Sequence, residues 1–205
     1  MTLAKLLPLS FVMIAGPQIL SAIFLATTDE WQKDSAAFVA GAGISVTLFA
    51  TLGYLLSTGA SDNGASNTTL DIIILVLLLA AALHKFLTRK QSEPPKWMGR
   101  LETIKPKGAF ILGFLLLGVF PSDILTSIAV GGSASAHGLP WWELLIFVFL
   151  TLLFLALPSL MVLILGEKAK RAMPKIRDWM NANSWVVSEI VLALFIALTL
   201  SSLSS

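Results

Sequence analysis

Long apolar runs alternate with short polar segments along the whole chain. The runs cover residues 6–26, 36–56, 70–87, 109–130, 141–165 and 185–203. Each is close to the roughly 17–25 residues that a helix needs to cross the hydrocarbon core of a bilayer. The pattern therefore predicts an all-α polytopic membrane protein with six transmembrane helices.

The composition agrees with this class. Hydrophobic residues make up 56% of the 205 residues and charged residues only 13%, whereas soluble domains carry roughly 25% charged residues. The net charge of +2 gives no reason to expect a nucleic-acid partner. The absence of cysteine from the sequence excludes disulfides and thiolate metal sites.

Two prolines interrupt matching positions in the first and fourth runs. Pro17 lies in the sequence AGPQIL, and Pro121 lies in VFPSDIL. A proline inside a helix removes one backbone donor, and in lipid the freed groups must be satisfied by protein or by a water-filled cavity. We therefore expect helices 1 and 4 to be broken near the bilayer midplane, as in transporters with a central site.

The matching breaks indicate an internal repeat. We assign residues 1–87 and 109–205 to two three-helix repeats, joined by a basic linker at 88–108. The sequence LFATLG at 48–53 also aligns with LFLALP at 153–158, where Pro158 is expected to break the fifth helix. Three helices is an odd number, so the second repeat enters from the opposite face and the topology is predicted to be inverted.

The orientation follows from the basic residues in the connecting segments. Lys and Arg concentrate in 88–108 and 166–184, whereas 57–69 and 131–140 contain none. Basic segments stay on the cytoplasmic side, which predicts a multi-pass plasma-membrane protein with 27–35, 88–108 and 166–184 in the cytoplasm and both termini outside. We expect the first run to be retained, since it exceeds the roughly 7–15 apolar residues of a signal peptide.

Asp123 is the one deeply placed ionisable residue in these runs. A charge at the bilayer centre costs roughly 2.5–3.5 kcal/mol on the insertion scale, so we interpret Asp123 as a coupling or head-group-binding residue. The alternative is a protonated side chain that bonds a carbonyl freed at the proline break. Further polar side chains could line the same site, or could make ordinary helix–helix hydrogen bonds. They are Gln18, Ser21, Ser122 and Ser127.

Catalysis is not indicated. The sequence contains no HExxH, GxSxG or phosphate-loop motif, and its acidic residues are spread out rather than clustered as metal ligands. We therefore expect a protein that is not an enzyme and that uses no cofactor and no metal site.

The chain resembles the GAP family of sulfolipid- and glycopeptidolipid-addressing proteins, within the lysine-exporter superfamily. The resemblance rests on IAGPQI, GVFPSD and the helix containing Pro158, and it extends over nearly the whole chain. The thiol-carrying branch of the superfamily requires a cysteine pair that this chain lacks. The resemblance implies export of a lipid or glycolipid across the plasma membrane, beside a larger proton-driven lipid transporter.

The resulting hypothesis is an exporter that works by alternating access around a midplane site, with membrane lipids as its surroundings and a lipid or glycolipid as its substrate. Two alternatives stay open. One is an exporter of a small solute or cation, and the other is an accessory scaffold for a larger lipid transporter. A homodimer is compatible with the sequence, which names no interface for it.

Overall fold

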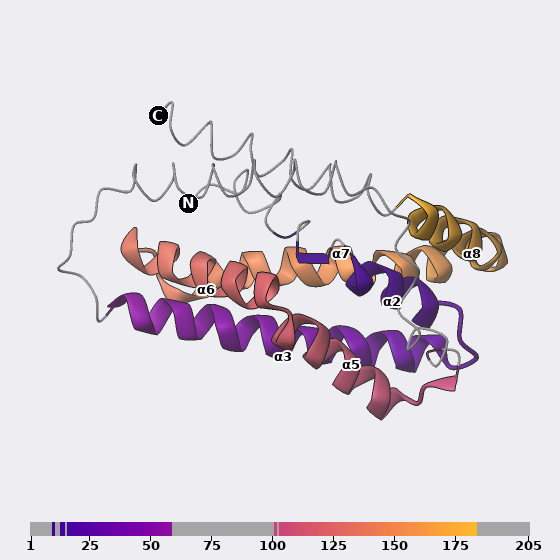
Figure 1. Ribbon diagram of the computed structural model, residues 1–205, viewed down its shortest axis with the longest axis horizontal. Helices are drawn as coiled ribbons and strands as arrows, with labels where there is room; N and C mark the ends of the chain where they lie inside the picture. Colours follow the sequence, from indigo (N-terminus) through magenta and orange to yellow (C-terminus); the bar gives the residue numbers. More distant parts are fainter. Residues whose placement is uncertain (1–9, 11–12, 15, 59–100, 102, 184–205) are drawn as a thin grey trace.

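The computed structural model of the protein describes residues 10, 13–14, 16–58, 101 and 103–183 (Figure 1). Every regular element in this part of the chain is helical. The elements are α2 (Pro17–Leu25), α3 (Trp31–Thr58), α5 (Pro106–Val119), α6 (Pro121–Ala136), the short 3₁₀ helix η2 (Trp141–Glu143), α7 (Leu144–Leu165) and α8 (Glu167–Ala182). The predicted spans at 70–87 and 185–203 lie outside the described residues.

Two of the helical segments, Trp31–Ser57 and Trp141–Leu165, are long and apolar enough to cross a membrane. A third span results if α5 and α6 are counted as one bent helix. This part of the chain is thus that of an integral membrane protein. Helix α3 begins earlier than the predicted 36–56, so residues 31–35 are helical rather than part of a loop. Asp34 in its first turn is compatible with the positive end of the helix dipole.

The fourth predicted helix is divided at Phe120. This residue has an extended conformation, with φ −70° and ψ 121°, and separates α5 from α6, whose axes differ by 72°. The cause lies in the next residue, because Pro121 has no N–H to donate and disfavours a helical conformation in the residue before it.

A second helix start occurs at Pro17. Ile14 is still helical, whereas Gly16 is a turn residue with φ 135°, and α2 then begins at Pro17. A φ of this size is readily adopted by glycine alone, and proline is well suited to the first helical position.

Pro158 behaves differently from the other two prolines. It lies inside α7, which continues through it to Leu165, so no helix end occurs there. The Ser159 hydroxyl donates to the Ala156 carbonyl at 2.9 Å. Pro158 itself has no N–H to donate to the carbonyl of Phe154, four residues earlier. Neighbouring helices, side chains and local adjustments allow a membrane helix to accommodate a proline without ending.

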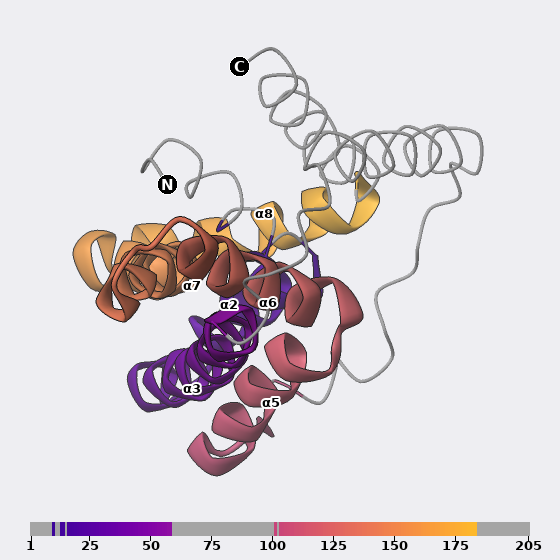
Figure 2. The ribbon, with the colours of Figure 1, turned by 90° about the vertical axis from the view of Figure 1, so that its left-hand side faces the viewer.

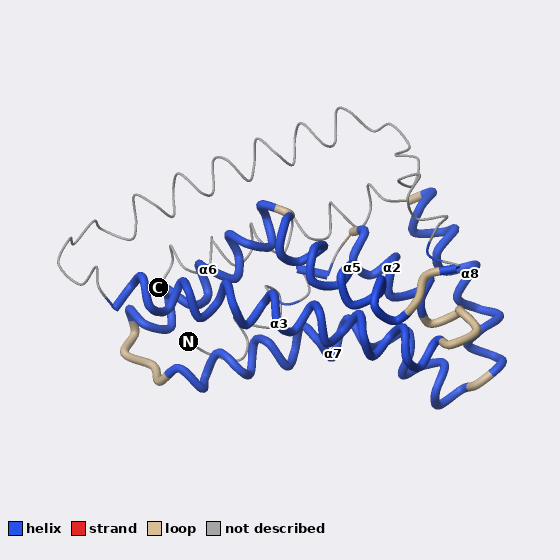
Figure 3. Tube along the Cα trace, turned by 90° about the horizontal axis from the view of Figure 1, so that it is seen from below, coloured by secondary structure: helices blue, strands red, loops and turns tan. Residues whose placement is uncertain are grey.

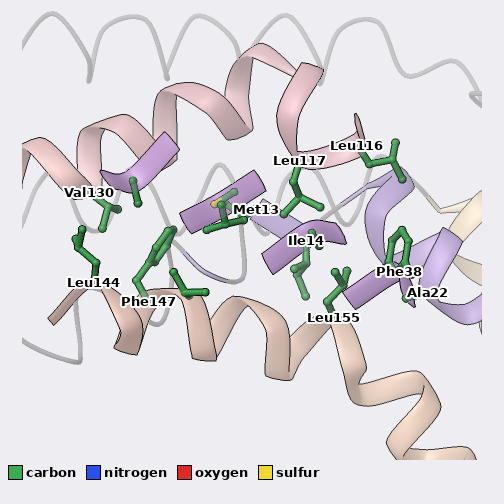
Figure 4. Close-up of a cluster of buried hydrophobic side chains, with 14 of the residues drawn as sticks. Met13, Ile14, Ala22, Phe38, Leu116, Leu117, Val130, Leu144, Phe147 and Leu155 are labelled. Atoms are coloured by element: carbon green, nitrogen blue, oxygen red, sulfur yellow. The ribbon is translucent and has the colours of Figure 1, made fainter. Parts of the chain in front are cut away.

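Helix α3 runs along the described bundle and packs against α5, α6 and α7 (Figures 1 and 2). Figure 4 shows the main apolar cluster, in which Phe38 of α3 lies with side chains from α5, α6, α7 and the segment before α2. Phe147, Leu155, Leu117 and Met13 are among its fully buried members. The core therefore joins the predicted first and second halves of the chain.

Glycines bring α3 into backbone contact with both α5 and α6. A Cβ at Gly113 of α5 would collide with the Phe38 carbonyl, and one at Gly131 of α6 would collide with the Ala50 carbonyl. Along α3, Phe38 comes before Ala50, and their contacts Gly113 and Gly131 follow in the same order along α5 and α6. Helix α3 therefore runs in the same direction as the α5–α6 pair. Small residues of this kind are typical of close helix packing in membranes.

The connection between α6 and α7 is fastened to the end of α3. The Tyr54 hydroxyl donates to the Leu139 carbonyl at 2.8 Å, and the Trp141 indole N–H donates to the Thr51 hydroxyl at 3.0 Å. Two polar bonds thus hold this end of the bundle.

The opposite end of the bundle collects the segments predicted to be cytoplasmic. The end of α2, the starts of α3 and α5, the end of α7 and helix α8 lie there together (Figure 1). The expectation of a loop at 166–184 is wrong, because most of it forms α8. Its Ala, Lys, Arg, Glu and Met residues all favour helix, and Ala169 and Met173 are buried against other helices. Which end faces the cytoplasm, and the inverted repeat itself, stay predictions.

Two adjacent glycines in α6 allow a matched test of this packing. Gly131→Ala should lower the free energy of unfolding by about 1–3 kcal/mol, because its Cβ meets the backbone of Ala50 and Tyr54. Gly132→Ala should be neutral or stabilise by up to about 1 kcal/mol, since its Cβ would lie 3.7 Å from the Gly53 carbonyl oxygen. Denaturant titration in detergent micelles measures both, and equal effects would contradict the close approach of α3 and α6.

Candidate functional site

A buried hydrogen bond joins the two proline-started helices. The Gln18 amide Nε2 donates to Oδ2 of Asp123 at 2.6 Å, although the residues are 105 positions apart. Both residues are only 3% exposed. Gln18 follows Pro17 in the first turn of α2, and Asp123 follows Pro121 in the first turn of α6. The structure therefore brings together the polar residues that the sequence places after its two breaks.

Two side chains lie within hydrogen-bonding distance of the Asp123 carboxyl group. Its second oxygen, Oδ1, lies 3.4 Å from the Ser122 hydroxyl, which is a long contact. Asp123 is the acidic residue of the first turn of α6, where the dipole of a helix favours negative charge. Its backbone N–H is already used, because it donates to the Phe120 carbonyl at 3.1 Å. Gln18 is thus the main side-chain partner of this carboxyl group.

The Gln18 amide has one unused atom. Its Oε1 is buried and has no hydrogen-bond partner. This oxygen lies beside Gly16, since a Cβ added to Gly16 would be 3.1 Å from it. An ionised carboxylate can only accept a hydrogen bond, whereas a protonated one can also donate. If the amide turned over, Oε1 could accept from a protonated Asp123. The pair can therefore accommodate either protonation state of the carboxyl group.

The remaining predicted residues lie near this pair but have other partners. The Ser21 hydroxyl donates to the Pro17 carbonyl of its own helix at 2.7 Å, as in an ordinary helix bond. The Ser127 hydroxyl is buried and points to the Met13 sulfur at 3.6 Å, a weak acceptor. Ser122 is exposed. Of the five predicted site residues, the structure therefore joins only Gln18 and Asp123, with Ser122 beside them.

Ser45 is a residue whose position the sequence did not indicate. Its hydroxyl is fully buried without a partner, and a Cβ on Gly118 would lie 2.6 Å from it. Ser45 therefore faces the last turn of α5, just before the break. In the sequence it belongs to a run of small residues, which predicts close packing and gives no sign of a site.

The contribution of the Gln18–Asp123 bond can be measured with a double-mutant cycle. Gln18→Leu or Asp123→Leu alone leaves a buried polar partner unsatisfied, which costs about 1–3 kcal/mol. The double variant should lose less than the sum of the two, with a coupling of about 1.5–3 kcal/mol if the bond involves a charge. Unfolding in micelles gives the four free energies. Additive losses would show that the two side chains do not interact.

The comparison with known families covers nearly the whole chain. Residues 6–202 match the family model described as Sap, sulfolipid-1-addressing protein. Comparisons with curated proteins and with solved structures gave no match. The family match confirms the resemblance inferred from the residues around Pro17 and Pro121. The chain, a helical membrane protein, therefore belongs to the Sap, sulfolipid-1-addressing protein family.

Proposed function

We propose that the protein moves a lipid or glycolipid, or its polar head group, across the plasma membrane by alternating access around Gln18 and Asp123. The observation that carries this proposal is their hydrogen bond. It connects two half-helices, one from each predicted repeat, in the interior of the bundle. Membership in a family named for sulfolipid-1 addressing supports a lipid as the cargo.

The site has the features that an anionic head group would need. The starts of α2 and α6 carry the partial positive charge of helix N-termini, and broken helices bind anionic substrate groups in this way in transporters. A sulfated head group would be repelled by an ionised Asp123 and tolerated by a protonated one. Head-group binding and protonation of Asp123 would therefore favour each other, which would couple lipid movement to a proton.

Movement would require the two halves to separate. Gln18 and Asp123 are each 3% exposed, so a head group can reach them only after their bond is broken. Each residue of the pair is preceded by a bend in the chain. Gly16 lies before α2, which carries Gln18, and Phe120 lies before α6, which carries Asp123. Hinges of this kind, at the ends of helices, absorb the change in backbone angles when domains move.

The decisive variant is Asp123→Asn in proteoliposomes that contain only this protein. Asparagine keeps the shape and can still accept from Gln18, but it cannot exchange a proton. We expect fluorescent lipid translocation and coupled internal pH change to fall at least tenfold, which corresponds to roughly 1.4 kcal/mol. Chemical quenching of the outer-leaflet dye measures translocation. Asp29→Asn, the same change at an exposed residue, is the matched control.

The outcomes separate the proposal from its alternatives. Translocation by Asp123→Asn at the parental rate would reject the coupling role. Equal loss in Asp29→Asn would show that general electrostatics, and not the buried pair, is responsible. If the folded parental protein moves neither lipid nor protons, an accessory role beside a larger transporter or export of a small solute becomes the better explanation.

A further inference from the structure

Helix α8 lies across the end of the bundle, directly after a membrane span. Only Gly166, with φ 56°, separates it from the last residue of α7. In Figure 3, α7 runs along the bundle while α8 runs across its end. A helix that turns sharply at the end of a span begins at the level of the lipid head groups.

One narrow face holds α8 on the bundle. Ala169 and Met173 are buried in a cluster with Ile23 and Ala26 from the α2 region and Val162 of α7. The Arg177 guanidinium lies over the Phe24 ring, 4.8 Å from its centroid, which adds a cation–π contact to α2. Most of the other described residues of α8 are exposed.

Three cations form a row on the exposed part of α8. Lys168, Arg171 and Lys175 follow a spacing of three and four residues, which places them on one side of a helix. All three are exposed. Within the described part of the chain, none of them has an acidic partner.

The two acidic residues of α8 are paired with other basic residues of the same helix. Glu167 lies 3.8 Å from the Lys170 ammonium, and Asp178 lies 2.9 Å from the Arg177 guanidinium. The helix therefore presents the row of Lys168, Arg171 and Lys175 without compensating charge. Such a row is complementary to an anionic surface.

An apolar ridge borders this row. Trp179 is 53% exposed and Ile176 is 37% exposed, and Trp179 lies one turn after Lys175 on the same side of the helix. Ile176 lies between Trp179 and the buried Met173 around the helix, at 100° per residue. Tryptophan beside lysine and arginine is typical of helices that lie in the membrane interface.

We infer that α8 is an interfacial helix whose Lys168–Arg171–Lys175 row binds the head groups of anionic phospholipids, while Trp179 and Ile176 enter the boundary of the acyl chains. The occupant is the lipid leaflet around the bundle. The apolar ridge lies between the row and the face packed on α2 and α7, and α8 directly follows a helix long and apolar enough to span the membrane, so both the row and the ridge are adjacent to lipid. This inference does not depend on transport through the Gln18–Asp123 site.

The test uses the full chain in vesicles of phosphatidylcholine that contain a fixed fraction of acyl-brominated lipid. The brominated lipid is either phosphatidylglycerol, which is anionic, or phosphatidylcholine. Bromine quenches nearby tryptophan, and the difference between the parental protein and Trp179→Phe isolates the Trp179 signal. We expect both lipids to quench Trp179, with stronger quenching by phosphatidylglycerol that weakens as salt is added.

Charge variants identify the residues responsible. The triple variant Lys168→Gln, Arg171→Gln, Lys175→Gln should lose the preference of α8 for phosphatidylglycerol over phosphatidylcholine. At low salt, each cation removed should lower that preference roughly fivefold. The control triple Lys33→Gln, Lys105→Gln, Lys107→Gln removes the same charge from the same end and should retain it. Glutamine is a good helix former, so unfolding in phosphatidylcholine should be unchanged in both.

Three results would overturn the inference. The first is that neither brominated lipid quenches Trp179. The second is that the two lipids quench the parental protein equally. The third is that the α8 triple variant keeps the preference for phosphatidylglycerol, or that the control triple variant loses it to the same extent. The first would place α8 away from the membrane, and the others would remove the role of its cationic row.

Discussion

The contact between the backbone of α3 and the two halves of the bent helix is the constraint on which the described structure depends. A bent membrane helix exposes backbone groups that lipid cannot satisfy. Here α3 is continuous, while α5 and α6 differ in direction by 72°, and glycines let it touch both. Gly113 and Gly131 therefore pack both halves of the helix that Pro121 interrupts against the backbone of α3.

The position of the candidate site follows from this arrangement. Because α6 starts at a fixed place beside α3, Asp123 is buried where the start of α2 can reach it. The two proline breaks act together, since each places a polar residue in a first helical turn and the bundle brings those turns into contact. A single break would leave Asp123 without its Gln18 partner, and a buried unpaired carboxyl group is costly.

The two ends of the bundle are held together by different contacts. At one end, Tyr54 and Trp141 fasten the α6–α7 connection to α3 through single hydrogen bonds. At the other end, α8 crosses the bundle and touches α2, the half-helix that carries Gln18. One short helix of nine residues therefore contacts both α8 and Asp123.

The sequence by itself determined the membrane class, the family and the helix starts at Pro17 and Pro121, because apolar length and the missing proline N–H act locally. It also selected Asp123 and Gln18, since polar residues in apolar runs are conspicuous. Only the tertiary structure decided that Ser21 and Ser127 have other partners, that α7 continues through Pro158, and that Ser45 faces α5. These features depend on which helices pack together and how closely, and a linear pattern of residues does not specify that distance.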